Sequence, residues 1–478
     1  MARRGIHFLR TVSRVEAKES WHSALDLGPL DDQELSLDDA QGRVLARDIE
    51  VPVDVPPFDR SLVDGYAVNA ADTFDAEEDA PVTLELLPEK APAGAVPEME
   101  VGGAKALEVA TGGVIPRGAN AVQMVELSEV QGNTLRLFKP VAPGSNIQGA
   151  GADMRTGETV LRAGQVLTTR ELGVLAAMGI DRIKVHRRPR VAIISTGDEL
   201  VLPGQVLEPG MIFDSNGTTV AAAVRDHGGE PEFLGVIPDD EKELRSACER
   251  AHGEFDAVIL SGGTSKGAGD LTFGIIDEMD DPGILVHGVS IKPGKPIVLA
   301  AWGRRPVAIL PGFPTSAIVT FNLFVAPVIR KLAGLPAVAE GETLEASLAV
   351  RYHSADGRHE HVLVNLVPGG EGGTAAYPIS GASGSIHAFA QADGTMEVPA
   401  YRGVVREGEL VRVMPLVNKT TVPDLTIIGR HCRGVDLALG LLRREGEVSA
   451  KVISVGSSAG VEACARGETD LAGSHLLD

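Results

Sequence analysis

The sequence predicts a multidomain protein of mixed α/β and β class. We expect an elongated helical domain with a β-rich insertion, a doubly wound α/β domain, a small β-barrel domain and a C-terminal βαβα fragment. Three observations predict this class. The 478 residues exceed what one hydrophobic core holds. Strand and helix patterns alternate between residues 188 and 335, as in a parallel sheet covered by helices. Short apolar runs separated by glycine-rich turns fill residues 336–417, which is typical of a small β-barrel or sandwich, and we expect the barrel.

The expected domain boundaries follow from these patterns. They are 1–53 and 143–187 for the two segments of the helical domain I, 54–142 for the inserted domain II, 188–335 for the α/β domain III, 336–417 for the barrel domain IV, and 418–478 for a linker and the C-terminal fragment.

The first 187 residues have a helical pattern that β runs interrupt. Val12 to Leu27 is amphipathic, and Ser36 has the character of a second helix start. Pro56-Pro57 then forces an extended chain, and short β runs follow. The segment TTRELGVLAAMGI, capped by Thr168 or Thr169, returns to helix. The β-rich part is therefore interpreted as an insertion.

Domain III contains five apolar runs with strand character, namely VAIIS, PEFLGVI, AVILS, PIVLAAW and PVAILP. Helical patterns lie between and after them, and the last helix is expected to be capped by Thr315. No G-x-G-x-x-G follows the first strand, which argues against a dinucleotide site. AVILS opens into Ser261-Gly262-Gly263, and Asp270 is the expected N-cap of the next helix. A strand, a glycine turn and a helix N-terminus together favour anion binding.

Charge and composition exclude several functions. Lys+Arg 44 minus Asp+Glu 66 gives −22, which disfavours nonspecific attraction to nucleic acid or to an anionic membrane. We find neither a signal-peptide apolar region nor an apolar run of about 18 residues, so no membrane span is expected. Cys248, Cys432 and Cys464 form no C-x-x-C pair, which fits a reducing compartment. We expect a cytoplasmic protein whose anionic ligand needs a local basic cluster or a divalent cation.

Chemistry-bearing residues follow the successive strands of domain III. In an open parallel sheet these loops meet outside the carboxyl ends of the strands. Glu199, Asp239 and Asp270 offer the oxygen ligands that magnesium takes, with water and substrate phosphate. Lys292 and Lys295 suit phosphoryl groups or oxyanions. Taken singly, these residues have ordinary interpretations as solvated charges, an N-cap or surface lysines. Their convergence on one sheet edge favours a shared site.

Seven motifs together resemble one family, the molybdopterin molybdenumtransferases (molybdenum insertases, including the gephyrin E-domain type). They are PPFDRSLVDGYAV, TGGVIPRGANAV, STGDEL, DSNG, SGGTSKGAGD, IKPGKP and LPGFPTSA, in family order, and the resemblance spans about residues 10–415. It implies the same four-domain plan. It also implies a homodimer whose cleft takes domain III from one subunit and parts of domains I, II or IV from the other.

The resemblance implies that adenylyl-molybdopterin and molybdate react, with Mg²⁺, to give molybdenum cofactor and AMP. Glu199, Asp239 and Asp270 would hold the hydrated cation and position the phosphates, while Asp64 and Thr111 would reach the cleft from domain II, across the dimer. The residues implied to bind or shape the site for the oxyanion or pyrophosphate are Ser265, Lys292, Lys295, Pro296, Pro311, Pro314, Ser316, Arg358 and Ser383. The implied partners are a molybdopterin adenylyltransferase that hands over the substrate and maturation factors of molybdoenzymes.

Three positions depart from the family pattern. Val63 replaces the usual methionine, Phe313 the usual asparagine of the LPGNP-type turn, and Gly288 a lysine of some members. The asparagine change removes a local side-chain hydrogen bond. Nothing in the sequence separates molybdate from tungstate as the oxyanion.

Residues 425–478 resemble the opening of the periplasmic-binding-protein-like domain that is fused to some members of this family. Such a domain needs about 200 residues for two lobes, so we expect a truncated copy. Ser457, Ser458 and His475 are candidate ligand contacts there, with a structural role as the alternative.

Two other functions stay open. The chain could be a molybdopterin adenylyltransferase, although residues 1–185 and domain IV argue against that. It could also be a noncatalytic scaffold that binds molybdate or the cofactor.

Overall fold

The computed structural model describes residues 11–263, 268–337, 343–355, 357–370, 373–379, 384–416, 423–446 and 448–474, with the backbone alone for residues 268–270. Contacts divide the chain into two compact units, of which one is Asp32–His186 and the other combines Met1–Asp31 with Arg187–Asp478. The first helix of the chain therefore belongs with the α/β domain. The rest of the predicted first segment, 1–53, lies in the other unit.

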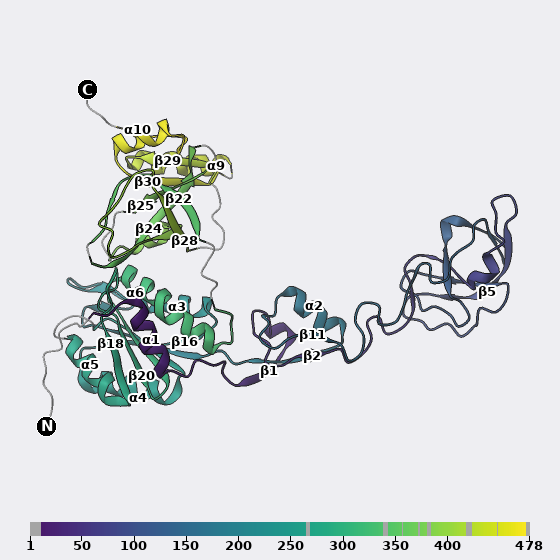
Figure 1. Cartoon of the computed structure of the whole chain (residues 1–478), viewed down its shortest axis with the longest axis horizontal. Coiled ribbons are helices and arrows are strands. Elements are labelled where there is room, and N and C mark those ends of the chain that lie inside the picture. Colours follow the sequence, from purple (N-terminus) through teal and green to yellow (C-terminus); the bar gives the residue numbers. More distant parts are fainter. Residues whose placement is uncertain are drawn as a thin grey trace. The chain divides into compact units, whose positions relative to one another are not determined.

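The β-rich insertion forms a six-stranded sheet, of which β5 is labelled in Figure 1. The strand order is β7-β4-β6-β5-β9-β8. Its strands are β4 (Gly65–Val68), β5 (Val82–Ala91), β6 (Lys105–Val109), β7 (Ala121–Met124), β8 (Ser128–Gln131) and β9 (Thr134–Leu137). All neighbours are antiparallel except β5 and β6. Leu84, Leu107 and Leu135 are buried in its core. The short β runs predicted after Pro56-Pro57 are confirmed as strands.

The remainder of this unit is built mainly from short antiparallel strand pairs. They are β1 (Asp32–Ser36) with β12 (Arg182–His186), β2 (Ile49–Glu50) with β11 (Thr159–Leu161), and β3 (Arg60–Ser61) with β10 (Ile147–Gln148). Helix α2 (Thr169–Ala177) has the predicted cap at Thr168, completed by Glu171 as a capping box. The prediction of a second N-terminal α-helix that starts at Ser36 is wrong. The chain forms only a 3₁₀ turn at Leu37–Asp39, because the preceding residues pair with β12.

The α/β domain has a six-stranded sheet in the order β16-β13-β17-β21-β20-β18. The strands are β13 (Arg190–Thr196), β16 (Glu230–Ile237), β17 (Ala257–Ser261), β18 (Pro282–His287), β20 (Val298–Trp302) and β21 (Arg305–Leu310). The first four in spatial order are parallel, and β20 and β18 are antiparallel additions. Ser195 pairs with Ser261, and Ser261 with Leu310. The carboxyl ends of three strands are therefore level.

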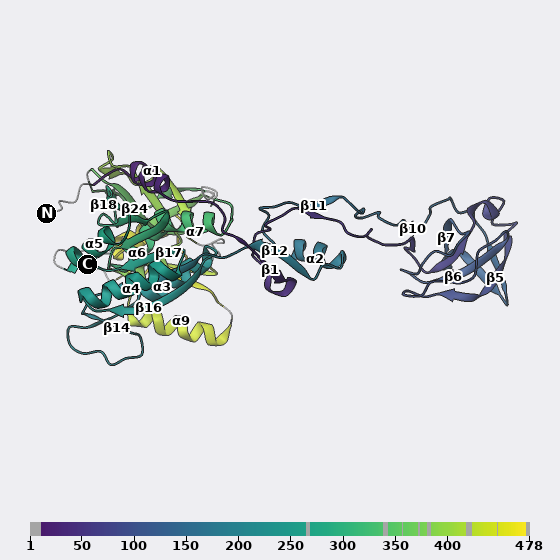
Figure 2. The same cartoon turned by 90° about the horizontal axis from the view of Figure 1, so that it is seen from below.

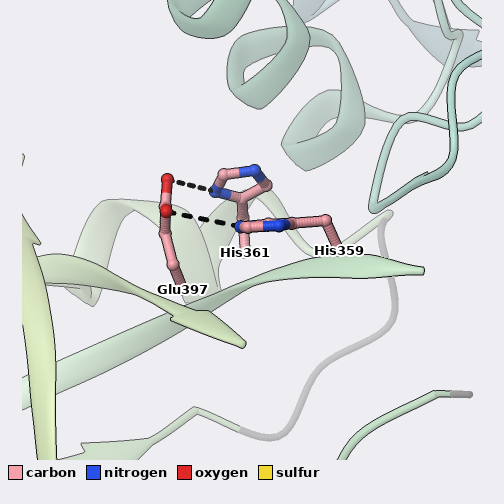
Figure 3. Close-up of side chains that lie close together, drawn as sticks. All are labelled: His359, His361 and Glu397. Carbon is pink, nitrogen blue, oxygen red and sulfur yellow. Dashed lines mark hydrogen bonds and ion pairs between the residues drawn. The ribbon is translucent and has the colours of Figure 1, made fainter. Parts of the chain in front are cut away.

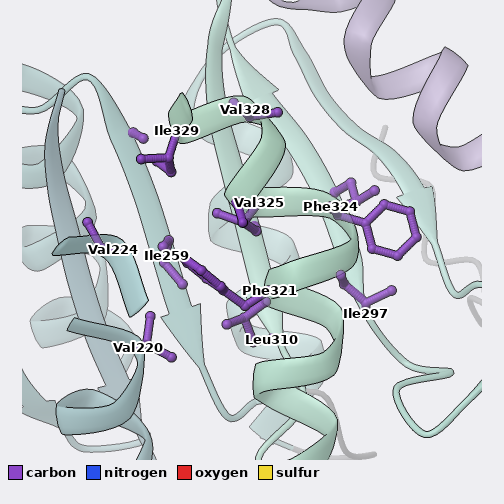
Figure 4. Close-up of a cluster of buried hydrophobic side chains, with 14 of the residues drawn as sticks. Val220, Val224, Ile259, Ile297, Leu310, Phe321, Phe324, Val325, Val328 and Ile329 are labelled. Atoms are coloured by element: carbon purple, nitrogen blue, oxygen red, sulfur yellow. The ribbon is translucent and has the colours of Figure 1, made fainter. Parts of the chain in front are cut away.

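Helices cover both faces of this sheet (Figure 2). One core includes residues of α1 (Arg14–Ala24), α3 (Asn216–Asp226) and the continuous run α6 (Pro314–Thr320), η4 (Phe321–Val325) and α7 (Ala326–Leu332). The other includes residues of α4 (Glu241–Glu254) and α5 (Ala268–Met279). Figure 4 shows Phe321, Val325 and Ile329 of the long helix facing Ile259 of the sheet. Burial of such side chains is the main source of stability.

The helical run Pro314–Leu332 has 19 residues and a mean hydropathy of 1.3, and 72% of its apolar window is buried. By length and composition alone it could cross a membrane, and it is the one such helix among the residues that the structure describes. Its packing in the α/β core accounts for its apolar character.

Domain IV is a closed five-stranded barrel, which confirms the barrel prediction. The strand order is β24-β25-β22-β28-β26, and β26 pairs again with β24. The strands are β22 (Leu344–Leu348), β24 (His359–Pro368), β25 (Thr374–Pro378), β26 (Gly394–Val398) and β28 (Leu410–Pro415). The short strand β19 (Ile291–Lys292), from the α/β segment, adds to β24. This pairing joins the barrel to the loop that carries the two predicted lysines.

The C-terminal segment has the predicted βαβα order. It comprises β29 (Leu425–Gly429), α9 (Arg433–Glu445), β30 (Ala450–Ser454) and α10 (Ser457–Ala465), with β29 and β30 parallel. Ile428 and Ile453 pack in one cluster with Tyr377 of the barrel. The Tyr377 hydroxyl donates to Glu468, which also pairs with Arg466 at 2.9 Å. The segment is thus held against the barrel wall.

Candidate active site

A cavity of about 1300 Å³ lies at the carboxyl ends of the parallel strands. The α/β loops after β13, β16, β17 and β21 form one part of its wall, and the β19 loop and the barrel form the rest. The predicted site residues that line it are Glu199, Asp239, Lys292, Lys295, Pro296, Pro311, Pro314, Ser316 and Arg358. Residues far apart along the chain therefore meet at one edge of the sheet, as the parallel topology requires.

Two of the predicted acids lie on the α/β wall of the cavity. Glu199 follows β13 and Asp239 follows β16, and the Asp239 backbone N–H donates to the Asp198 carboxylate at 3.0 Å. Burial raises the pKa of Asp239, and the negative charges of Asp198 and Glu199 raise it further. A cluster of oxygen ligands whose charges repel one another fits a hydrated magnesium ion, because the cation would relieve that repulsion. The donor set present therefore fits the implied metal.

Asp270 was predicted as the N-cap of the following helix, and this is wrong. Helix α5 begins at Ala268, so Asp270 lies within its first turn. The Asp270 side chain, Ser265, Ser383 and His475 lie outside the described part of the chain. Their predicted roles stay predictions.

The DSNG motif connects three loops of the cavity. Asp214 is 3% exposed and accepts from Ser195 Oγ at 2.7 Å and from the Gly217 N–H at 3.0 Å. Asn216 is also buried, and its amide donates to Ser261 Oγ and to the Gly312 carbonyl, both at 2.8 Å. The sequence marked this motif without a role for either side chain. The structure assigns both to holding the ends of β13, β17 and β21 together.

The glycine turn after β17 needs glycine for two reasons. Gly262 and Gly263 have φ values of +100° and +64°, a region that L side chains rarely adopt. A Cβ on Gly263 would also lie 2.7 Å from the Thr272 hydroxyl. The hydroxyls of Thr196 and Thr272 are buried without a hydrogen-bond partner among the described residues. Both hydroxyls lie beside the turn, where a Cβ on Gly263 would meet them.

Lys292 is held by a buried carboxylate that sequence reasoning missed. Its ammonium pairs with Glu360 Oε1 at 2.6 Å, and Glu360 is 3% exposed. Glu360 also accepts from Tyr352 Oη at 2.8 Å, Ser354 Oγ at 2.7 Å and the Ala355 N–H at 3.1 Å. Burial opposes ionisation of Glu360, but the hydrogen bonds from these partners together lower its pKa. No local pattern in the sequence indicated this partner, because Lys292 and Glu360 meet only through the pairing of β19 with β24.

Pro314, rather than a polar cap, begins the helix at the rim. Phe313 is the N-cap residue and provides no side-chain hydrogen bond, as its replacement of asparagine predicted. The expected cap, Thr315, is buried and instead donates to the Ser385 carbonyl at 3.0 Å. The Thr315 prediction is therefore wrong, because this hydroxyl connects the helix to the chain beside the barrel. Ser316 is 4% exposed and lines the cavity.

Asp64 and Thr111 come together within the other unit. Asp64 Oδ1 accepts from the Thr111 N–H at 2.7 Å and from its hydroxyl at 2.9 Å. These two hydrogen bonds, the backbone one first, lower the pKa of Asp64. Asp64 also lines a pocket of about 360 Å³ with Lys90 and Glu108. Ser457 and Ser458 begin α10 of the C-terminal segment and do not line the cavity that the described residues form.

Comparisons with known proteins agree with this architecture. Residues 12–179 match the "MoeA N-terminal region (domain I and II)", residues 192–331 the "Probable molybdopterin binding domain" and residues 345–416 the "MoeA C-terminal region (domain IV)". The molybdopterin molybdenumtransferase of Nostoc sp. is 35% identical over 388 residues, which cover 79% of this chain and 87% of that protein. Molybdopterin molybdenumtransferase 2 of Mycobacterium tuberculosis is 38% identical over 304 residues, which cover 63% and 75%.

Solved structures show the same fold. Two crystal structures of the molybdopterin biosynthesis MoeA protein from Pyrococcus horikoshii are 36% and 34% identical to this chain, with TM-scores of 0.75 and 0.67. They cover 86% and 84% of this chain, and 100% and 99% of their own chains are matched. The fold is thus a MoeA-like multidomain fold with a closed five-stranded barrel. Because relatives align over most of both chains and the folds agree, this chain belongs to the molybdopterin molybdenumtransferase family.

Proposed function

We propose that this chain inserts molybdenum into molybdopterin, taking adenylyl-molybdopterin and molybdate and releasing molybdenum cofactor and AMP. One observation carries the proposal: the acids Glu199 and Asp239 and the lysines Lys292 and Lys295 line the same cavity. Acids alone would suit a metal, and lysines alone would suit an anion. The combination suits a reaction in which a phosphate-bearing substrate and an oxyanion meet.

The lysines and Ser316 would bind negatively charged oxygens. Molybdate and the pyrophosphate link of the adenylate both carry such oxygens, and an ammonium donates to them with charge assistance. The ion pair between Lys292 and Glu360 holds that ammonium at the barrel side of the cavity. Glu360 thereby positions Lys292 without binding substrate itself.

Glu199 and Asp239 would hold magnesium, with Asp270 as the proposed third acid. When bound, the ion supplies positive charge that neutralises phosphate oxygens during cleavage. Glu199 and Asp239 would hold the ion in the cavity that Lys292 and Lys295 also line, so the phosphate link would meet positive charge from both sources. This arrangement stabilises charge that develops on the leaving AMP.

The test supplies adenylyl-molybdopterin, Mg²⁺ and molybdate and measures AMP release together with active cofactor. We expect Asp239→Asn and Lys295→Ala to reduce turnover by at least about a hundredfold, the scale of losing an electrostatic contact in an active site. Lys242→Ala, an exposed lysine of α4, is the matched control. AMP release that is independent of molybdate and of Asp239 would refute the proposal. Adenylylation of molybdopterin from ATP would instead identify an adenylyltransferase, and binding without turnover a scaffold.

The proposal also includes a cytoplasmic homodimer. It would receive its substrate from a molybdopterin adenylyltransferase and pass the product to molybdoenzyme maturation factors. Asp64 and Thr111 would then act on the cavity of the partner copy. Mixing Asp64→Ala and Asp239→Ala chains should restore part of the activity that each lacks, and a monomer in sedimentation velocity would contradict this part of the proposal.

A further inference from the structure

A second cluster of metal-ligating side chains lies on the barrel, apart from the acids of the α/β loops. It consists of His359, His361 and Glu397, whose ligand atoms all lie within 4.8 Å of one another (Figure 3). His359 and His361 are the first and third residues of β24. Since side chains alternate along a strand, both lie on the same face. Glu360 between them lies on the opposite face, with Lys292 and Tyr352.

Barrel closure brings Glu397 to these two histidines. In the antiparallel pairing of β24 with β26, His361 lies directly opposite Glu397. His359 lies two residues before His361 on the same strand and is the diagonal neighbour of Glu397. The three side chains therefore converge because the fifth strand of the barrel returns to the first. No local sequence pattern contains this cluster.

The distances between the ligand atoms are close to those around a tetrahedrally coordinated ion. His359 Nε2 lies 3.3 Å from Glu397 Oε2, and His361 Nδ1 lies 3.7 Å from Glu397 Oε1. Figure 3 shows one nitrogen of each ring directed at the carboxylate. Zinc bonds of about 2.1 Å place neighbouring tetrahedral ligands about 3.4 Å apart. All three ligand atoms lie within 4.8 Å of one another, as ligands of a single ion would.

His361 is the buried member of the cluster. Its side chain is 2% exposed, and its Nε2 has no hydrogen-bond partner among the described residues. The other ring nitrogen, Nδ1, is the one that lies near Glu397 and is the atom available as a ligand. An imidazole that binds a cation through Nδ1 carries its proton on Nε2, and Nε2 then faces outward from the cluster. His361 also lines the active-site cavity.

We propose that His359, His361 and Glu397 form a binding site for a divalent transition-metal ion of the zinc type. Two imidazoles and one carboxylate suit zinc and its first-row neighbours, whereas magnesium takes oxygen ligands. The site is therefore chemically distinct from that of Glu199 and Asp239. Three protein ligands leave a fourth position for water or another ligand. A cation there adds positive charge to the barrel side of the cavity.

Arg14 places a positive charge beside the proposed metal site. Its guanidinium pairs with Glu397 Oε1 at 2.8 Å. Arg14 begins helix α1, and its side chain is 33% exposed, so it can turn into solvent. The guanidinium and a metal ion therefore compete for the same carboxylate. Arg14→Gln should raise metal affinity by about tenfold, because a positive charge next to a ligand disfavours a bound cation.

The experiment uses the full chain, stripped with a chelator and then titrated with Zn²⁺ by calorimetry, and with Co²⁺ by absorption spectroscopy. We expect one ion per chain and the visible absorption of tetrahedral Co²⁺. His359→Gln, His361→Phe and Glu397→Gln should each weaken binding by at least about a hundredfold, since changes in outer-shell partners alone cost 10–100-fold. His359 is only half-buried, so its variant tests the site even where His361→Phe does not fold.

Two controls separate this site from others. His431→Gln removes an exposed histidine that is paired with Asp436 at 2.9 Å, and binding should be unchanged. The double variant Glu199→Gln/Asp239→Asn should keep the Zn²⁺ affinity of the wild type while losing AMP release. Zn²⁺ binding that survives all three ligand substitutions, or that disappears in the double variant, would overturn the proposal. Absence of Zn²⁺ and Co²⁺ binding to the wild-type chain would also overturn it.

Discussion

Glu360→Gln tests whether one buried carboxylate positions a lysine of the cavity. Glutamine has nearly the same shape but no charge, and it replaces one acceptor oxygen by an NH₂ group. Oε1 of Glu360 faces Lys292 and Tyr352, and Oε2 faces Ser354 and the Ala355 N–H. Whichever way the amide turns, its NH₂ group meets hydrogen-bond donors. The substitution therefore removes the ion pair and at least one further hydrogen bond.

The expected cost follows from these contacts. A hydrogen bond to a charged group contributes about 1.5–3 kcal/mol, and two are lost. The ion pair counts for less than a fully buried pair because the Lys292 side chain is 46% exposed. Relief from burying a charge offsets part of the remainder. We expect the free energy of unfolding of the barrel to fall by about 2–3 kcal/mol.

Thermal denaturation followed by circular dichroism measures this loss, with Glu345→Gln on the exposed side of β22 as the matched control. Molybdate affinity should also fall by about tenfold, which corresponds to about 1.4 kcal/mol, because Lys292 is no longer held at the cavity. In the double variant with Lys292→Ala, the two effects on affinity should not add. Unchanged affinity in Glu360→Gln, or full additivity in the double variant, would refute the positioning role.

Three further predictions concern the α/β domain. Asn216→Ala removes the amide that donates to the Gly312 carbonyl. Thermal denaturation should show that the free energy of unfolding falls by about 2 kcal/mol, and turnover should fall as well. Unchanged turnover would contradict the role of Asn216 in connecting the loops. Gly262→Ala places a Cβ against a backbone oxygen of β13 at a φ of +100° and should abolish AMP release, whereas Gly253→Ala, which has open space in α4, should be tolerated. Burial first, and then two lysines, lower the pKa of His22 from 6.5 to about 4. The folded state therefore resists protonation, and the stability that His22 contributes is complete above about pH 6.5 and is lost as the pH falls towards 4. His22→Gln should flatten this part of the stability profile in urea unfolding, and an unchanged profile would exclude His22 as its source.

The local pattern of the sequence was sufficient for most elements of the α/β domain. Five apolar runs became β13, β16, β17, β20 and β21. Most residues of β13, β17, β20 and β21 are buried, and strands buried on both faces are continuous apolar segments. It failed for β18, which adds to the edge of the sheet beside β20, and for the two-residue β19, which pairs with β24 of the barrel. Helix starts were also misplaced. Threonine is a common N-cap residue. The Thr315 hydroxyl nevertheless donates a hydrogen bond to the Ser385 carbonyl and does not cap the helix.

The sequence by itself determined that Glu199 and Asp239 would meet, because parallel strands with crossover helices align their carboxyl ends on one edge of the sheet. It could not determine what the barrel adds to that edge. Lys292 reaches Glu360 only through the pairing of β19 with β24, and His361 reaches Glu397 only when β26 closes the barrel. Strand pairing between distant segments depends on the register of the whole sheet, and no short stretch of residues encodes that register.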